Sequence, residues 1–329
     1  MYERFAMDRS LSFVIIILLS MVSPGAAFED QVRSDKQRNL SPIKVGILHS
    51  LSGTMAFSEK SLEEAARLAI KEVNARGGVL GGRLLEPVIE DGASDPMTFA
   101  SKAKKLIVED QVASVFGCWT STSRKAVLPI FEEYNNLLWY PLQYEGRESS
   151  PNIIYTGATP NQQIIPAVDW CHREFGSRVF LVGSDYIFPR TANEIIRMRL
   201  GDFGATLVGE EYRPLGSQDF DELVAQIDES KPDVVFSTLN GDSNRGFFTA
   251  LRKSGIDAMQ IPVLSFSIAE HELLDIGVEL TAGHFASWTY FQSIDTPANR
   301  RFVREFKNEY GRERVTDDPI EAAYSQIHM

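Results

Sequence analysis

The chain has 329 residues and a formal net charge of −12. Hydrophobic residues make up 43% and charged residues 24%, the proportions of a folded globular protein, and the length is enough for two lobes of ordinary size. The acidic balance and the lack of any basic run argue against nucleic acid or an anionic membrane surface as a partner.

The first thirty residues have the layout of a secretory signal peptide. Arg4 and Arg9 precede an apolar run at Leu11–Val22, and small residues follow at Ser23–Ala27. We expect a signal peptide over 1–27, a polar leader over 28–42 and a periplasmic protein. The alternative is an uncleaved anchor helix, for which the run is short. No cysteine follows the run, so a lipid anchor is not expected.

Strands and helices alternate from residue 43 onward. The expected strands are Ile43–Leu48, Leu84–Glu90, Ala113–Phe116, Asn152–Thr156, Arg178–Ser184, Thr206–Tyr212, Asp233–Thr238, Pro262–Phe266 and His284–Tyr290. The expected helices are Ser61–Arg76, Pro96–Glu109, Gln162–Phe175, Thr191–Leu200, Asp219–Glu229, Ser243–Ser254 and Ala298–Tyr310. This order predicts an α/β fold in which each lobe is a parallel sheet flanked by helices.

The stretch from Phe116 to Gly146 is the best candidate for a ligand-binding turn. It predicts a strand, a turn rich in Ser and Thr, a helix, and a second strand that ends at Tyr140. Hydroxyls before a helix are good N-caps, and the free N–H groups there can also hold a ligand oxygen. Ligands of such sheets bind beyond the carboxyl ends of strands. Four segments fall on those edges: Cys118–Ser123, Tyr140–Gln143, Ser184–Phe188 and Asn240–Asn244.

The residues that usually carry catalysis do not form a recognisable set. The five histidines lack a metal-binding spacing, and no metal or cofactor is expected. Thr122 and Lys125 have the spacing of the S-x-x-K motif, but its companion motifs are missing. The two cysteines, Cys118 and Cys171, are expected in different lobes as free, buried thiols. We therefore expect a protein that is not an enzyme.

An ordered set of short motifs carries a family resemblance. These are His49–Met55, Phe116–Ser121, Ser123–Lys125, Tyr140–Gly146, Tyr155–Gly157, Pro160–Gln163, Ser184–Arg190, Asn240–Asn244 and Ser293–Pro297. With them the chain resembles the substrate-binding proteins of bacterial ABC importers, of the Leu/Ile/Val-binding type. Within that group it is most similar to the branch that binds urea or short-chain amides.

The resemblance implies a two-lobed, hinged type I periplasmic binding protein fold. Its lobes would cover 43–159 and 160–290, with a return into the first lobe over 291–329. The helix that begins at Pro319 stops without a closing strand, either as a frayed terminus or, as we favour, because the C-terminal part is missing. The implied function is capture of urea in the cleft and delivery to a permease, the only link to a membrane. The alternative is a binding protein or sensory receptor for formamide or acetamide.

The resemblance also implies the ligand-binding residues. Hydroxyls would come from Ser121, Tyr140 and Tyr186, walls from Trp119 and Phe188, and weaker contacts from Gln143 and Asn240. Each has a plainer interpretation: Ser121 as an N-cap, Trp119 as a core aromatic, Tyr140 as a structural strand end. Leu142 and Phe188 stand where the amidase-regulator branch has Thr and Tyr, which favours urea over acetamide.

Overall fold

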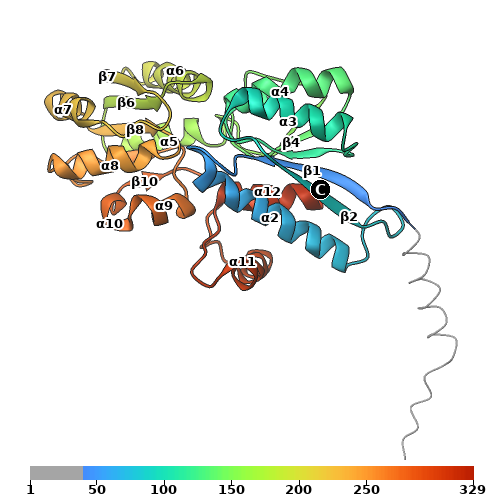
Figure 1. Ribbon diagram of the computed structural model, residues 1–329. Helices are drawn as coiled ribbons and strands as arrows, with labels where there is room; N and C mark the ends of the chain where they lie inside the picture. Colours follow the sequence, from blue (N-terminus) through green and yellow to red (C-terminus); the bar gives the residue numbers. More distant parts are fainter. Residues whose placement is uncertain (1–39) are drawn as a thin grey trace, which may run out of the picture. The chain divides into compact units, whose positions relative to one another are not determined.

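The computed structural model describes residues 40–329, and residues 42–329 contain two five-stranded parallel sheets (Figure 1). The strand orders are β2-β1-β3-β4-β5 and β10-β9-β8-β6-β7. The predicted α/β architecture of two helix-flanked parallel sheets is therefore confirmed. The predicted signal peptide and most of the predicted leader lie outside the described residues.

The first sheet and the helices around it form what we call the first lobe. Its strands are β1 (Ile43–His49), β2 (Leu85–Asp91), β3 (Val115–Gly117), β4 (Leu138–Tyr140) and β5 (Ile153–Tyr155). Its helices are α2 (Ala56–Ala75), α3 (Pro96–Val108), α4 (Ser121–Tyr134), α11 (Pro297–Tyr310) and α12 (Asp318–His328). Helices α3 and α4 cover one side of the sheet, and α2 and α12 lie on the other (Figure 1).

The second sheet and its helices form the second lobe. Its strands are β6 (Arg178–Ser184), β7 (Thr206–Arg213), β8 (Val234–Thr238), β9 (Val263–Ser265) and β10 (Phe285–Ala286). Its helices are α5 (Ile164–Glu174), α6 (Ile187–Asp202), α7 (Asp221–Ser230), α8 (Ser243–Lys253), α9 (Glu270–Ile276) and α10 (Val278–Thr281). Successive side chains of β6 point to opposite faces of the sheet and pack in two hydrophobic cores: Leu181 packs with α5 and α6, whereas Phe180 packs with α7 and α8.

Three expected elements differ clearly from the structure, the first being α6, which begins at Ile187, four residues before the expected start at Thr191. Helix α2 begins at Ala56, five residues before the expected start at Ser61, and its N-cap Met55 makes no side-chain capping bond. The expected strand His284–Tyr290 is reduced to Phe285–Ala286. Beyond Ala286 the chain leaves the sheet, and the Trp288 Nε1–H donates to the carbonyl of Ile268 at 2.7 Å. Helices α9 and α10 were not predicted.

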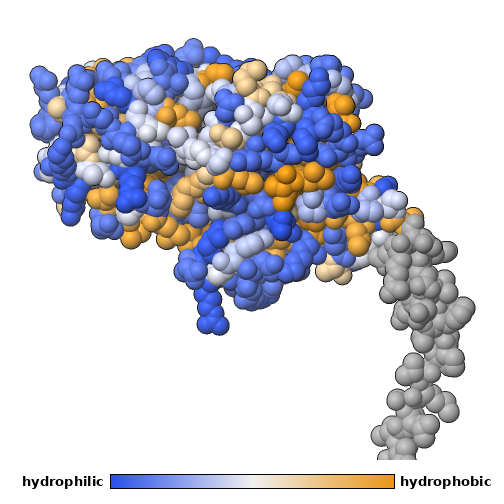
Figure 2. Space-filling view, in the orientation of Figure 1, coloured by the Kyte–Doolittle hydropathy of each residue, from blue (hydrophilic) through white to orange (hydrophobic). Residues whose placement is uncertain are grey.

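The chain passes from the first sheet to the second after β5 and returns after β10. The lobe boundaries at 43–159, 160–290 and 291–329 themselves stay a prediction. The face seen in Figure 2 is mainly hydrophilic, with smaller groups of apolar residues between the hydrophilic ones. Within residues 40–329, no helix combines the length and the apolar character that crossing a bilayer requires.

Candidate functional site

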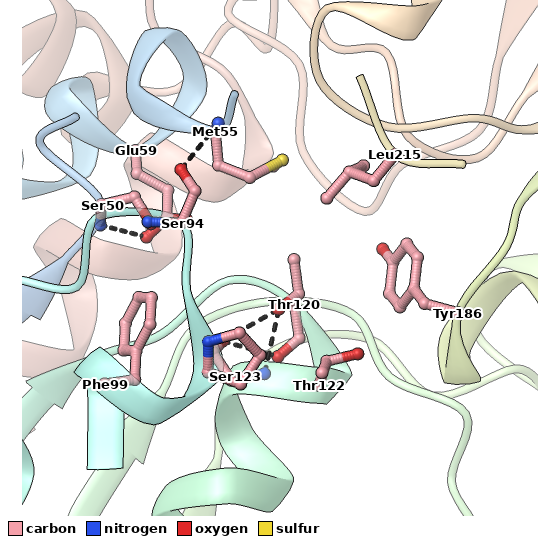
Figure 3. A pocket seen from close by; sticks show the side chains of 11 residues that line it. Ser50, Met55, Glu59, Ser94, Phe99, Thr120, Thr122, Ser123, Tyr186 and Leu215 are labelled. Atoms are coloured by element: carbon pink, nitrogen blue, oxygen red, sulfur yellow. Dashed lines mark hydrogen bonds between the residues drawn. The ribbon is translucent and has the colours of Figure 1, made fainter. Parts of the chain in front are cut away.

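A cavity of about 160 Å³ lies where the two lobes meet, at the carboxyl ends of the strands (Figure 3). The first lobe lines it with Ser50, Met55, Glu59, Ser94, Pro96, Phe99, Thr120, Thr122 and Ser123. The second lobe contributes Tyr186 and Leu215. The cavity is small compared with the roughly 300–1,000 Å³ of sites for drug-sized ligands, so it suits a small molecule.

The acidic side chain of the cavity is Glu59, in the first turn of α2. Its Oε2 accepts a hydrogen bond from the backbone N–H of Ser50 at 2.7 Å, and the Nδ1 of His49 is 3.4 Å away. Glu59 and His49 are each only 1% exposed. The Glu59 carboxylate is thus held in place by the end of β1 and presented to the cavity.

Hydroxyl groups surround the other side of the cavity. Thr120 is the N-cap of α4, and its Oγ1 accepts from the backbone N–H of Ser123 at 3.0 Å. The Ser123 hydroxyl donates back to the Thr120 carbonyl at 2.8 Å. On the facing loop the Ser94 hydroxyl accepts from the backbone N–H of Met55 at 3.1 Å. The polar lining is therefore bonded into the loops that carry it.

The backbone beneath this turn is tightly constrained. A Cβ atom at Gly117 would lie 2.1 Å from the carbonyl oxygen of Leu48, so only glycine fits between β3 and β1. The next residue, Cys118, has a φ of +65°, a left-handed conformation that is uncommon for a residue other than glycine. Its N–H donates to the Leu48 carbonyl at 2.8 Å. This geometry sends the chain abruptly from the sheet into the cavity-lining turn.

Of the predicted ligand-binding residues, Tyr186 lines the cavity. Burial raises the pKa of its phenol well above the usual value, and the nearby Tyr140 and Glu145 add to the effect. Trp119 and Phe188 do not line the cavity: Trp119 packs in the core of the first lobe, Phe188 in that of the second. The proposed wall role of these two residues stays a prediction.

Ser121 and Tyr140 lie beside the cavity in a buried charged cluster. Its centre is Arg124, which is fully buried and donates to Glu148 at 2.7 Å, to Glu145 at 2.8 Å and to the Ser121 hydroxyl at 3.1 Å. Ser121 in turn donates to Glu145 at 2.6 Å. The Tyr140 hydroxyl donates to the Trp119 carbonyl at 2.5 Å, and its ring lies 4.9 Å from the guanidinium carbon. Both hydroxyl protons are therefore used inside the first lobe.

Gln143 and Asn240 each keep one buried acceptor without a partner among the described residues. The Gln143 Nε2 donates to the carbonyl of Phe266 in the second lobe at 3.1 Å, and the Asn240 Nδ2 donates to the Thr238 carbonyl at 3.2 Å. Because each NH₂ group is bound to a carbonyl, the amide oxygen must point the other way. Both of these oxygens, Oε1 and Oδ1, are buried and unpaired.

The lobes approach closely at the edge of the cavity. A Cβ atom on Gly216, whose φ is +85°, would lie 2.9 Å from Cγ2 of Thr54. A Cβ atom on Gly241 would lie 3.0 Å from Sδ of Met55. These glycines let two loops of the second lobe rest against the turn that follows β1.

Sequence reasoning did not name seven of the lining residues as part of the site: Ser50, Met55, Glu59, Ser94, Pro96, Phe99 and Leu215. Ser94 follows the carboxyl end of β2, so the strand-edge rule could have found it. Glu59 was missed because the helix was expected to start at Ser61. For a metal ion, the described residues hold no suitable group of three or more His, Cys, Asp or Glu side chains.

Comparison with known proteins assigns the fold to a family. A family model described as "Periplasmic binding protein domain" matches residues 43–329. The chain is 25% identical over 293 residues to the Leu/Ile/Val-binding protein homolog 6 of Brucella melitensis, covering 87% of the chain and 74% of that protein. It is also 26% identical over 198 residues to the Leu/Ile/Val-binding protein BraC3 of Rhizobium johnstonii, a match that covers 59% of this chain and 53% of that protein.

Two solved structures share the fold. One is an R. palustris ABC transporter solute-binding protein in complex with 4-hydroxybenzoate, with a TM-score of 0.80, 24% identity and coverage of 88% of this chain and 79% of that one. The other is the branched-chain amino acid transporter substrate-binding protein LivJ of Streptococcus pneumoniae in complex with isoleucine. Its TM-score is 0.77, its sequence identity is 19%, and the match covers 87% of this chain and 82% of that one.

Proposed function

Because this chain belongs to the periplasmic binding protein family, whose members bind solutes for ABC transporters, we propose that it captures urea between its lobes and delivers it to a membrane permease. The proposal includes export by the signal peptide predicted over 1–27 and action in the periplasm. No catalysis is part of it.

The observation that carries the proposal is the buried carboxylate of Glu59 in a lining without Lys, Arg or His. Urea is neutral and offers four N–H donors, which a fixed carboxylate accepts well. An anionic ligand would face the Glu59 carboxylate in a lining without Lys, Arg or His, and the nearest basic group is the buried imidazole of His49, 3.4 Å from Glu59 and outside the lining. This supports a small, donor-rich, neutral ligand over an aromatic acid.

The other polar groups fit the same ligand chemistry. The unpaired oxygens of Gln143 and Asn240 are further buried acceptors, although these two residues do not line the cavity and would reach the ligand only if the site extended toward them. The phenol of Tyr186, whose pKa is raised by burial, is a hydroxyl that can donate to the single oxygen of urea. Leaving such buried groups unpaired costs roughly 1–3 kcal/mol each, which would make the site reject ligands without N–H groups.

Short-chain amides are the second candidate. Met55, Phe99 and Leu215 give the cavity an apolar side that could take the methyl group of acetamide. A binding protein or sensory receptor for formamide or acetamide would then use the same polar groups.

The size of urea limits how tightly it can bind. At a ceiling of about −1.5 kcal/mol of binding free energy per heavy atom, its four heavy atoms give about −6 kcal/mol, which corresponds to a Kd of tens of micromolar.

Calorimetric titration of the purified chain with urea, formamide, acetamide, leucine and 4-hydroxybenzoate tests the proposal. We expect urea to bind most tightly, and Glu59→Gln to weaken it while Glu109→Gln, an exposed control, does not. Binding of leucine or 4-hydroxybenzoate without any urea binding would reject the assignment. Release of ammonia from urea would show an enzyme instead.

A further inference from the structure

The first turn of α9 is a contact between the lobes, close to the cavity but separate from it. The His271 ring stacks on Phe57 of α2, with the ring centres 4.5 Å apart and the planes at 13°. Its Nε2 lies 3.0 Å from the Ser61 hydroxyl. Since α9 belongs to the second lobe and α2 to the first, this contact breaks when the lobes separate.

Each lobe contributes one buried carboxyl group to this contact, Glu272 from the second lobe and Asp317 from the first. Glu272 of α9 is 5% exposed, and its Oε2 accepts from the backbone N–H of Ala269 at 3.0 Å; it also bonds the Ser58 hydroxyl of α2. Asp317, the N-cap of α12, is 1% exposed. Its Oδ2 accepts from the backbone N–H of His271 at 3.2 Å.

The charged groups around this pair are mostly acidic. The acidic ones are Glu270 and Asp275 on α9, Asp318 and Glu321 on α12, and Glu59, Glu63 and Glu64 on α2. The basic ones are Lys60 and Arg67 on α2, Arg245 on α8, which is 3.8 Å from Asp275, and Arg314 in the loop before α12. His271 is the remaining titratable group, and burial followed by Arg314 lowers its pKa, so it is neutral. Arg314 pairs with Glu64, and no basic group among the described residues forms an ion pair with Glu272 or Asp317.

Without a counter-charge, the buried pair favours a protonated form. Burial raises the pKa of Glu272 to about 7. Burial, and then the charge of Glu272, raises the pKa of Asp317 well above its usual value. Near neutral pH the pair therefore holds a proton that two carboxyl groups in water would have lost.

We propose that Glu272 and Asp317 retain this proton only while α9 rests on α2 and α12, so that closure of the lobes is linked to proton uptake. Opening withdraws α9 from the elements that bury the pair and returns both carboxyls to water. The contact is connected to the cavity through α2, because Ser58, which bonds Glu272, immediately precedes the lining residue Glu59. This inference rests on the proposed function only in so far as urea is the ligand that closes the lobes.

The direction of the pH effect follows from the raised pKa. Only well below about pH 4, the ordinary range of Asp and Glu in water, are both carboxyls protonated in the open and the closed form, so that closure needs no proton. Between about pH 4.5 and 7 the open form loses protons that the closed form keeps. Closure and ligand affinity then fall as the pH rises, by up to about tenfold per pH unit for each retained proton, and they level off only above the raised pKa values of the pair. His271 opposes part of this effect, because its pKa is lowered at the contact and returns toward the usual value when the lobes open.

Spin labels on cysteines placed at Met97 in the first lobe and Met259 in the second, both strongly exposed, report the distance between the lobes. Without ligand, we expect the closed population to fall as pH rises from about 5 to 7. Glu272→Gln, a neutral isostere, should abolish that dependence. Asp317→Asn should reduce it while keeping an N-cap. The exposed control Glu279→Gln should leave it unchanged.

The inference is overturned if the wild-type closed population does not respond to pH in this range, or if both variants respond as the wild type does. A urea titration over the same pH range provides the second measurement, with affinity expected to follow the closed population. If urea fails to bind at every pH, the proposed ligand is wrong, and the spin-label distances still decide the proton linkage.

Discussion

Replacing Arg124 by Met should destabilise the first lobe strongly. Arg124 is fully buried and bonds Glu148, Glu145 and Ser121. Methionine fills most of the space of the arginine side chain but supplies no charge and no donor. The consequence of the substitution therefore lies in the carboxylates left behind.

The two glutamates are not affected equally. Glu148 keeps Lys125, 2.5 Å away, and the hydroxyl of Tyr155 at 3.0 Å. Glu145, only 3% exposed, keeps the Ser121 hydroxyl, and its nearest remaining cation is Lys125 at 3.8 Å. The variant thus leaves about one buried carboxylate poorly compensated, for which about 3–5 kcal/mol of unfolding free energy is the expected loss. That is a large part of the roughly 5–15 kcal/mol that stabilises a typical protein.

Guanidinium chloride unfolding measures the loss, since urea as a denaturant could also bind the native protein. The exposed pair Lys253–Asp221 provides the control: Lys253→Met should leave the unfolding midpoint nearly unchanged, because solvent screens such a pair. Combining Arg124→Met with Glu145→Gln should recover part of the stability, because the uncompensated charge is removed. A loss below about 1 kcal/mol for Arg124→Met, or a double variant less stable than the single one, would refute this reasoning.

Three further outcomes are expected. Glu59→Gln should weaken urea binding about 5- to 15-fold in calorimetry, because a charged acceptor becomes a neutral one; an unchanged Kd would remove Glu59 from the site. Gly216→Val should shift lobe-to-lobe distances toward open, since its Cβ meets Thr54, whereas Gly204→Val, also at positive φ but with nothing within 4 Å, should not. Both thiols are buried, and burial raises the pKa of Cys171 to about 12. An aromatic disulfide reagent should therefore react with no thiol in the folded protein and with two after unfolding, and a reaction in the folded protein would contradict this burial.

The alternating strands and helices were predictable because each is a local feature of the sequence. The strand Arg178–Ser184 has the bounds predicted from its apolar run, and α11 starts one residue earlier than expected, at Pro297. Glu59 escaped prediction for a local reason as well. The cap residue of α2, Met55, makes no side-chain bond to the helix, so the usual signal for a helix start is missing.

The partners of the predicted site residues could not be found in the same way. Ser121 and Tyr140 do lie at neighbouring strand ends, as expected. However, Glu145, which accepts the hydrogen bond of the Ser121 hydroxyl, is 24 residues away from Ser121 in the sequence. Arg124, whose guanidinium lies over the Tyr140 ring, belongs to a different element from Tyr140. Such pairings depend on how helices and loops pack, which the order of residues along the chain does not contain.

Because any side chain at Gly117 would clash with the carbonyl of Leu48, the positions around the cavity fall into two classes: fixed backbone and replaceable side chains. The backbone at Gly117 and Leu48, which we call the floor, lies outside the lining but leads into the lining turn, and no side chain can be added at Gly117 without moving β1 against β3. Phe99 and Leu215 are ordinary side chains on the walls of the cavity, one from each lobe. A protein engineer seeking a new ligand would therefore vary these two walls and leave the floor intact, and related chains with other ligands should differ first at the same two positions.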